Sequence, residues 1–283
     1  MTRIATRALP LRQAVALGLL HGPTELLPIS SSGHTTLVPW LLGWSYGELD
    51  PSMRKSFEVA LHAGTAAALL AHPPAAYQRT RGSFMAGAII PPALTGYALG
   101  KQIERRLGKP ATIAGGLLAG SLALIASEPR KRVAYAHSRL IGALPPHSSA
   151  TRDLESAGLR DGLALGLAQS LALMPGLSRS GATLAAAQAL GFSREDSDKL
   201  SWRVGLPVVA GATLLKGAQL AREGLGGELK LPLAVGCTSA FLSTLASTKV
   251  LGPERRAALL PGCAIYRAAL ALLVIRRMRD NTS

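Results

Sequence analysis

A short polar motif occurs twice in this chain, and each copy interrupts an apolar stretch. Residues 28–35 and residues 176–183 align at a constant offset of 148 positions. Four aligned positions are identical in the two copies: Ser30 and Ser178, Ser32 and Ser180, Gly33 and Gly181, and Thr35 and Thr183. Proline and glycine break a helix at such points, so each apolar segment is expected to fold back on itself. In membrane proteins, corresponding interruptions in two halves point to a central site built from both halves.

Long apolar runs predict that the chain lies in a membrane. Hydrophobic residues make up 48% of the sequence and charged residues 17%. Outside the two motifs, six runs are mostly uncharged: 59–70, 85–99, 111–126, 204–215, 231–246 and 257–275. Several are shorter than the ~20 residues of a full membrane span, but abundant glycine, alanine and proline suits close packing in a helical bundle. We therefore expect an all-α polytopic membrane protein.

The order of these runs predicts two halves of a single membrane domain over residues 1–283. Each half is expected to hold one re-entrant helical hairpin followed by three transmembrane helices. The expected bounds are about 11–127 for the first half, 128–160 for a polar linker and 161–276 for the second half. Because three crossings are an odd number, the second half enters from the opposite face, which makes the duplication an inverted-topology repeat. The two hairpin tips are then expected to meet near the middle of the membrane.

The net charge of +15 favours anionic membrane lipids over nucleic acid as the partner. Aromatic residues make up 4% of the chain, and Lys and Arg bracket the apolar runs, as expected at lipid headgroups. These cations fall almost equally on the two sides of the expected topology, so the positive-inside rule leaves the orientation open. Cys237 and Cys263 lie in apolar runs and imply no disulfide framework.

The side chains at the two tips suit phosphoryl transfer. They are Glu25, Ser30, Ser31, Ser32 and His34 at the first tip, and Ser178, Arg179, Ser180 and Thr183 at the second. Arg179 and the amides of a helix start can bind phosphate oxygens. A serine can attack phosphorus if a neighbouring base takes its proton, and His34 or Glu25 can be that base. Alternatively, Glu25 can hold a divalent cation.

Each of these polar residues also has a purely structural alternative. Glu25 can cap a broken helix, His34 can be a hydrogen-bonded interior residue, and the serines can satisfy freed backbone groups. We expect several of the hydroxyl residues to do only that. His62, His72 and Glu58 lie in or beside an expected span without clustered partners, and we interpret them as structural.

Segments spread over nearly the full chain carry a family resemblance. They are Glu25–His34, Phe57–Thr65, Gly166–Gln169, Pro175–Thr183, Gly191–Arg194, Trp202–Pro207 and Tyr266–Arg267. These segments resemble the bacterial undecaprenyl pyrophosphate phosphatase family. The resemblance implies a membrane enzyme that removes the terminal phosphate of undecaprenyl diphosphate, recycles the lipid carrier for cell-wall synthesis and is linked to bacitracin resistance. It also implies re-entrant hairpins in an inverted repeat, dependence on Mg²⁺ or Ca²⁺, and a place in the bacterial cytoplasmic membrane.

The same resemblance implies roles for individual residues. Ser31 matches the proposed nucleophile, His34 its candidate base, and Arg179 the phosphate-binding arginine. The positions that match the surrounding hydroxyl groups are Ser30, Ser178, Ser180 and Thr183, and Ser32 and Gln169 complete the expected substrate-binding set.

The metal-binding motif departs from the family pattern. Glu25 matches the second acid of the Glu/Gln-x-x-x-Glu motif, but His21 occupies its first position. An imidazole binds metals without adding negative charge, and it favours softer ions than Mg²⁺ or Ca²⁺. We therefore expect Glu25 and His21 as the metal candidates, with weaker cation affinity or a less metal-dependent reaction.

Two alternatives to a phosphatase stay open from the sequence. A flippase or transporter for a lipid phosphate would also use an inverted repeat and Arg179, although it needs no nucleophile and base. A catalytically diverged paralogue would also explain the histidine at position 21. The expected partners are a polyprenyl diphosphate lipid substrate and membrane lipids, and a homodimer is left open.

Overall fold

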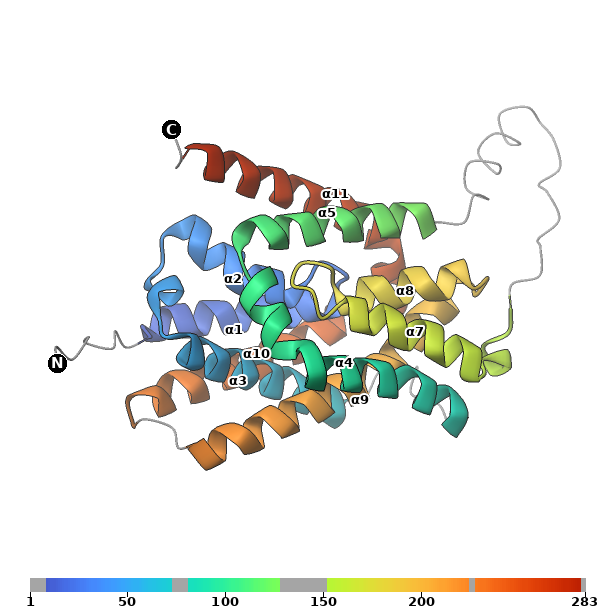
Figure 1. The fold of residues 1–283 in the computed structure, drawn as a ribbon, viewed down its shortest axis with the longest axis horizontal. Coiled ribbons are helices and arrows are strands. Elements are labelled where there is room, and N and C mark those ends of the chain that lie inside the picture. The colour runs from blue at the N-terminus through green and yellow to red at the C-terminus, as the bar shows by residue number, and fades with distance from the viewer. Residues whose placement is uncertain (1–8, 73–80, 128–151, 224–226, 281–283) are drawn as a thin grey trace.

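The computed structural model describes residues 9–72, 81–127, 152–223 and 227–280, and α-helices dominate it (Figure 1). Ten α-helices lie in those ranges: α1 (Leu11–Leu26), α2 (Ser31–Leu42), α3 (Pro51–Ala71), α4 (Gly82–Leu107), α5 (Pro110–Ser127), α7 (Leu159–Leu171), α8 (Arg179–Ala189), α9 (Arg194–Glu223), α10 (Gly227–Val250) and α11 (Pro253–Asp280). Two short 3₁₀ helices are η1 (Ser45–Glu48) and η2 (Leu154–Ser156). The described ranges contain no β-strand, so the all-α prediction is confirmed. Residues 128–151 of the predicted linker lie outside the described part of the chain.

Two helical hairpins, α1–α2 and α7–α8, form where the sequence interrupts its apolar stretches. Pro23 lies inside α1, which ends at Leu26, and Pro28 follows in the turn. In the second hairpin the turn contains Gly176 with a φ of 95°, a backbone conformation that favours glycine. Both predicted helix breaks are confirmed.

Glycine residues let the first helix of each hairpin approach a helix of the other half. A Cβ atom at Gly18 or Gly22 of α1 would overlap atoms of α10. A Cβ atom at Gly162 or Gly166 of α7 would overlap the backbone of α4. Helix α1 therefore packs on α10, and α7 packs on α4, so the two halves of the chain interleave (Figure 1).

The outer helices present an apolar surface. Among the described residues, four segments are long and apolar enough to cross a membrane: Pro110–Ser127, Arg194–Arg222, Leu229–Val250 and Ala258–Asp280. Large apolar side chains such as Leu94 and Leu122 are exposed on the helices, which suits contact with lipid and not with water. Helices α3 and α4 also form where two further spans are predicted. The chain is a polytopic helical membrane protein.

Candidate active site

Glu25 is the point at which the two hairpins meet. Its Oε1 atom lies 3.1 Å from Nη2 of Arg179, and its Oε2 atom accepts a hydrogen bond of 2.5 Å from the Ser31 hydroxyl. Glu25 is in the last turn of α1, Ser31 is the first residue of α2, and Arg179 is the first residue of α8. Residues from both halves therefore meet at one carboxylate, which is 7% exposed.

The two helix starts beside Glu25 have the same local structure. Ser30 and Ser178 are the residues with positive φ other than glycine in the described chain, at 75° and 68°. The hydroxyl of each serine accepts a hydrogen bond of 3.3 Å from the amide three residues later, at Gly33 and Gly181 respectively. Because the caps satisfy only part of each helix start, further amides remain as donors. Two helix N-termini at one site suit an anion.

Arg267 of α11 holds the two tips together. Its side chain is fully buried, and its guanidinium donates to the carbonyl oxygens of Pro28, Gly176 and Leu177 at 2.8, 3.0 and 2.9 Å respectively. Pro28 belongs to the first tip, and Gly176 and Leu177 belong to the second. The helix breaks leave these carbonyl oxygens without donors in their own helices, and the arginine supplies the missing donors.

Both ring nitrogens of His34 have hydrogen-bond partners away from Ser31. Nδ1 lies 2.7 Å from the carbonyl oxygen of Ser30, so this nitrogen is the donor. Nε2 lies 2.7 Å from the hydroxyl of Tyr266, and the two rings are stacked with centroids 5.5 Å apart. The group that contacts the Ser31 hydroxyl is Glu25.

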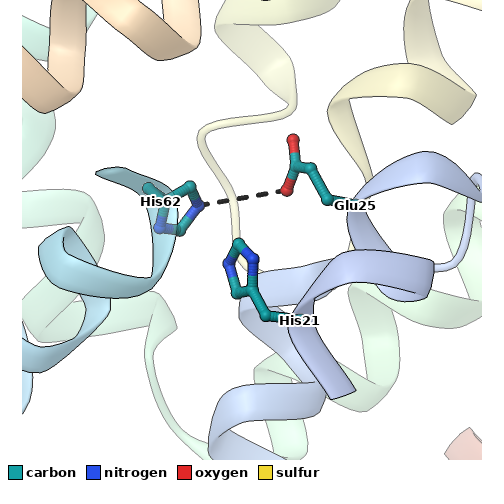
Figure 2. A group of neighbouring side chains, drawn as sticks. All are labelled: His21, Glu25 and His62. Atoms are coloured by element: carbon teal, nitrogen blue, oxygen red, sulfur yellow. Dashed lines mark ion pairs between the residues drawn. The ribbon is translucent and has the colours of Figure 1, made fainter. Parts of the chain in front are cut away.

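His21 and His62 lie beside Glu25 (Figure 2). The ligand atoms of these three residues lie within 4.8 Å of one another, and the two imidazole centroids are 4.5 Å apart. Nε2 of His62 is 4.0 Å from Oε2 of Glu25. The interpretation of His62 as a residue without clustered partners is therefore wrong, because α3 brings it to the end of α1.

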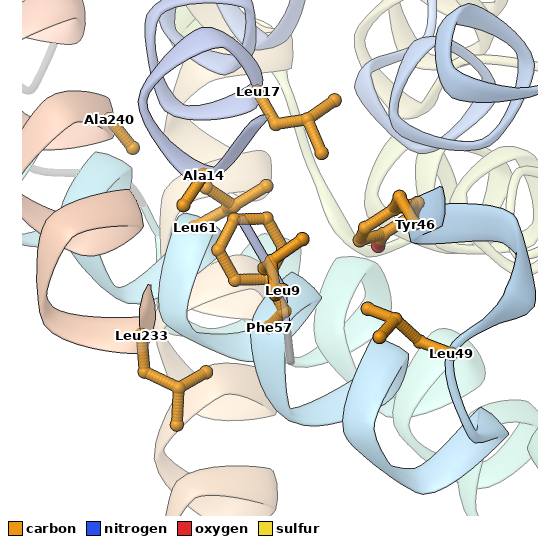
Figure 3. Close-up of a cluster of buried hydrophobic side chains, with 9 residues drawn as sticks. All are labelled: Leu9, Ala14, Leu17, Tyr46, Leu49, Phe57, Leu61, Leu233 and Ala240. Carbon is orange, nitrogen blue, oxygen red and sulfur yellow. The ribbon is translucent and has the colours of Figure 1, made fainter. Parts of the chain in front are cut away.

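An apolar cluster fixes α3 against α1 and α10, and with it the position of His62 (Figure 3). Phe57 and Leu61 of α3 are fully buried within this cluster. Leu17 of α1 and Ala240 of α10 belong to the same cluster. In a membrane, close packing of such side chains holds helices together, so this cluster contributes to the rigidity of the site.

The donor atoms near Glu25 do not fit Mg²⁺ or Ca²⁺. Both ions take oxygen ligands, with about six to eight around Ca²⁺. Here the cluster offers a single carboxylate together with the imidazoles of His21 and His62. The prediction of Mg²⁺ or Ca²⁺ therefore rests on the family resemblance, and the residues present favour another class of ion.

The other predicted substrate-binding residues differ in exposure and in hydrogen-bond partners. Ser32 is exposed at the start of α2, and the hydroxyl of Ser180 lies 3.3 Å from that of Ser178. Thr183 is buried one turn into α8 and donates to the carbonyl oxygen of Arg179 at 3.0 Å. Gln169 is buried in α7, where its Nε2 donates to the carbonyl oxygen of Ala88 at 2.9 Å. The described contacts connect Gln169 with α4 and not with Glu25.

Comparison with known proteins identifies the family. The model of the family described as bacitracin resistance protein BacA matches residues 14–273. The chain belongs to the BacA family. An undecaprenyl-diphosphatase of Geobacter sulfurreducens is 37% identical over 267 residues, which cover 88% of this chain and 91% of that protein. Enzymes of the same name from Geobacter metallireducens and Thermomicrobium roseum are 36% and 31% identical, over 81% and 93% of this chain and 84% and 96% of their own lengths.

Three residues at this BacA-family site were not assigned a role from the sequence. They are His62, Tyr266 and Arg267, each on a helix outside the two hairpins. For Arg267 the sequence did hold an indication, because a lone cation in the apolar run 257–275 is costly and usually functional. For His62 and Tyr266 no spacing in the sequence shows that their helix faces point at the tips.

Proposed function

We propose that this chain hydrolyses undecaprenyl diphosphate to undecaprenyl phosphate and inorganic phosphate, and so recycles the lipid carrier of cell-wall synthesis. Relatives named for that activity align with most of the chain. One observation in the structure carries the assignment: the Glu25 carboxylate bonds at once to the Ser31 hydroxyl and the Arg179 guanidinium. A nucleophile, its base and a cation that can bind the phosphate are therefore in direct contact.

Ser31 is the nucleophile in this proposal, and Glu25 is the base. The hydroxyl oxygen bonds to the terminal phosphorus while its proton passes to Oε2 of Glu25, 2.5 Å away. The bond from that phosphorus to the bridging oxygen breaks, and undecaprenyl phosphate leaves with the electron pair. After Glu25 has released its proton to solvent, it takes a proton from water as the water oxygen attacks phosphorus. The bond from phosphorus to Ser31 then breaks, inorganic phosphate leaves, and Ser31 regains a proton.

The neighbouring serines are less suited to attack. The Ser30 hydroxyl caps α2 by accepting from Gly33, and Ser32 is exposed at the first turn. Of these three serines, Ser31 is the one whose hydroxyl contacts a carboxylate. This geometry favours Ser31 among the three consecutive hydroxyl groups.

Arg179 and the two helix starts bind the phosphate in this mechanism. The Nε atom of Arg179 is buried and has no hydrogen-bond partner among the described residues, so it can donate to a substrate oxygen. Arg179 and Arg267 bring two positive charges to the tips, against the single negative charge of Glu25. Fixed donors aimed at developing charge are commonly the largest contribution to phosphoryl transfer.

His34 has a positioning role in this proposal. Its bonds to the Ser30 carbonyl and the Tyr266 hydroxyl tie the start of α2 to α11. Glu25 then accepts the proton of Ser31, and His34 fixes the backbone that carries Ser31.

The two halves form an inverted repeat in the bacterial cytoplasmic membrane in this proposal. Its supports are the matching caps at Ser30 and Ser178 and the reciprocal packing of α1 on α10 and α7 on α4. The hairpins are re-entrant, and α3 and α4 cross the membrane with their counterparts α9 and α10. A homodimer remains a prediction. The flippase alternative is not favoured, because the relatives are named as diphosphatases.

The test is phosphate release from undecaprenyl diphosphate by detergent-purified protein, with no added ion, with Mg²⁺, with Ca²⁺ and with Zn²⁺. We expect Ser31→Ala, Glu25→Gln and Arg179→Ala each to lower turnover by about 10²–10³-fold or more. Ser83→Ala and Arg276→Ala, at exposed positions on α4 and α11, are the matched controls and should leave turnover unchanged. Near-normal turnover by folded Arg179→Ala protein would contradict the assigned site, and no release by the parent chain would contradict the function.

A further inference from the structure

A ring nitrogen of His21 is buried without a partner beside a carboxylate. The His21 side chain is fully buried, and its Nε2 atom has no hydrogen-bond partner in the described part of the chain. Burying a polar atom without a partner costs about 1–3 kcal/mol. The other ring nitrogen, Nδ1, is held 2.9 Å from the Thr65 hydroxyl, which lies 3.2 Å from that of Thr244. The ring is therefore fixed, and its free nitrogen is available to a ligand.

His62 is held in the orientation of a metal ligand. Its Nδ1 atom lies 2.8 Å from the carbonyl oxygen of Glu58, and because a carbonyl only accepts, Nδ1 carries the hydrogen. In the neutral ring the lone pair is then on Nε2, which faces Oε2 of Glu25 at 4.0 Å. Metal-binding histidines commonly donate their second nitrogen to a backbone carbonyl in this way, which fixes the tautomer and the ring.

We propose that His21, His62 and Glu25 bind one divalent transition-metal ion, and specifically Zn²⁺. The ligand atoms of the three residues lie within 4.8 Å of one another (Figure 2). Zinc ligands lie about 2.0–2.2 Å from the ion, so two of them are at most about 4.4 Å apart, and binding draws these side chains slightly closer together. Two imidazoles and one carboxylate suit Zn²⁺, Mn²⁺ or Fe²⁺, whereas Mg²⁺ and Ca²⁺ require oxygen ligands.

The set leaves room for a reacting group. Three protein ligands and an open position are the usual arrangement of a catalytic zinc site. The Ser31 hydroxyl is 2.5 Å from Oε2 of Glu25, so it lies beside the cluster. Binding of the ion stands on this geometry alone, whereas its role beside a phosphate rests on the proposed phosphatase.

A competing arrangement contains no ion. If His62 is protonated, its Nε2 and the Glu25 carboxylate form an ion pair at 4.0 Å. That arrangement leaves the buried Nε2 of His21 without a partner. A metal ion satisfies all three groups together.

Titration with Co²⁺, a spectroscopic substitute for Zn²⁺, tests the proposal on the full chain in detergent after removal of metals by a chelator. We expect a single equivalent of Co²⁺ to give the intense visible bands of a four- or five-coordinate site. One equivalent of Zn²⁺ should abolish these bands, and a large excess of Mg²⁺ or Ca²⁺ should not. Weak bands of a six-coordinate ion, or displacement by Mg²⁺ at equal concentration, would overturn the proposal.

Variants assign the ligands. His62→Ala should weaken Co²⁺ binding by more than about tenfold and remove the intense bands, while His72→Ala, at an exposed position directly after α3, should change neither. His21→Glu replaces an imidazole by a carboxylate, so it should shift the preference toward Mg²⁺ and Ca²⁺ while keeping a site. Melting temperature and gel filtration establish that each variant folds, and His21→Glu keeps the test valid if His62→Ala does not.

Phosphate release measured on the same samples separates the two proposals. A His62→Ala protein that folds and binds Co²⁺ like the parent chain would overturn the metal site, whatever its activity. Loss of Co²⁺ binding in His62→Ala supports the site, even if the parent chain releases no phosphate.

Discussion

Gly205 on α9 lies directly against the guanidinium of Arg179. A Cβ atom at position 205 would overlap Nη1 of that arginine. The guanidinium is therefore enclosed on one side by α9 and bonded on another to Glu25. The absence of a side chain at position 205 is part of what places Arg179 at the site.

Gly205→Ala should therefore impair catalysis without unfolding the protein. The overlapping atoms are the end of a flexible side chain, so Arg179 moves aside while α9 remains in place, and alanine favours a helix by about 1 kcal/mol over glycine. We expect kcat/KM to fall by about 10–100-fold, since a displacement of about 1 Å can cost that much. Gly211→Ala, on the same helix with open space around it, is the control. Equal activity of the two variants would show that Arg179 is not held by Gly205.

Arg267 determines whether the two tips stay together. Arg267→Met keeps most of the apolar stem but leaves the carbonyls of both tips without their donor. Because each hydrogen bond from a charged donor contributes about 1.5–3 kcal/mol, we expect a lower melting temperature and a loss of turnover together. Arg276→Met, at an exposed position of the same helix, should change neither the melting temperature nor turnover.

A second variant tests Arg267 without changing it. A Cβ atom at Gly120 of α5 would overlap Nη2 of Arg267, so Gly120→Ala should displace the guanidinium. We expect the same direction of change in melting temperature and turnover as for Arg267→Met. A stable and fully active Gly120→Ala protein would argue against the role of Arg267 in holding the tips.

The helix breaks could be predicted from the sequence because their causes are local. Pro23, Pro28 and Gly176 disrupt helical geometry wherever they lie, and the repeated serines mark the next helix start. Bounds were harder to place: α3 begins at Pro51, before the apolar run 59–70, and the Asp50 carboxylate caps it by accepting from the Ser52 amide. The polar residues before this apolar run belong to the same helix, which the apolar pattern alone does not show.

The candidate site could be predicted only in part, because its remaining residues depend on tertiary packing. Glu25, Ser31 and Arg179 lie on the two duplicated tips, so the repeat itself brought them together in the prediction. His62 is different, because its place beside Glu25 depends on how Phe57 and its neighbours pack α3 against α1 and α10. Periodicity along one helix cannot show which other helix that face will meet.

Tyr266→Phe separates the roles of His34 and Glu25. The variant removes the partner of His34 Nε2 but retains the stacked ring. If His34 only positions the start of α2, we expect turnover to fall by less than about tenfold and stability by about 1 kcal/mol, the usual contribution of one hydrogen bond. Glu25→Gln should cost far more turnover, since it removes the base. A Tyr266→Phe loss as large as that of Glu25→Gln would instead place His34 in the chemistry.

The serine caps offer the last prediction, because a positive φ and a helix cap act in opposite directions on stability. Ser30 has a φ of 75°, which favours glycine, yet its hydroxyl caps Gly33. Ser30→Ala keeps the unfavourable backbone and loses the cap, so it should lower the free energy of unfolding by about 1 kcal/mol. Ser30→Gly loses the cap at a cost of a few tenths of a kcal/mol and relieves about 1 kcal/mol of backbone strain. We therefore expect it to be neutral or stabilising.

The same pair of substitutions at Ser178, with a φ of 68° and a cap on Gly181, should behave alike. Thermal unfolding in detergent, with scans of the four variants beside the parent chain, measures both effects. Because both variants lack the hydroxyl, alanine more stable than glycine at either position would show that the positive φ causes no strain there and would contradict the prediction. A different effect on stability at Ser30 and at Ser178 would show that the two caps contribute unequally despite their matching geometry. The matching caps predict equal effects.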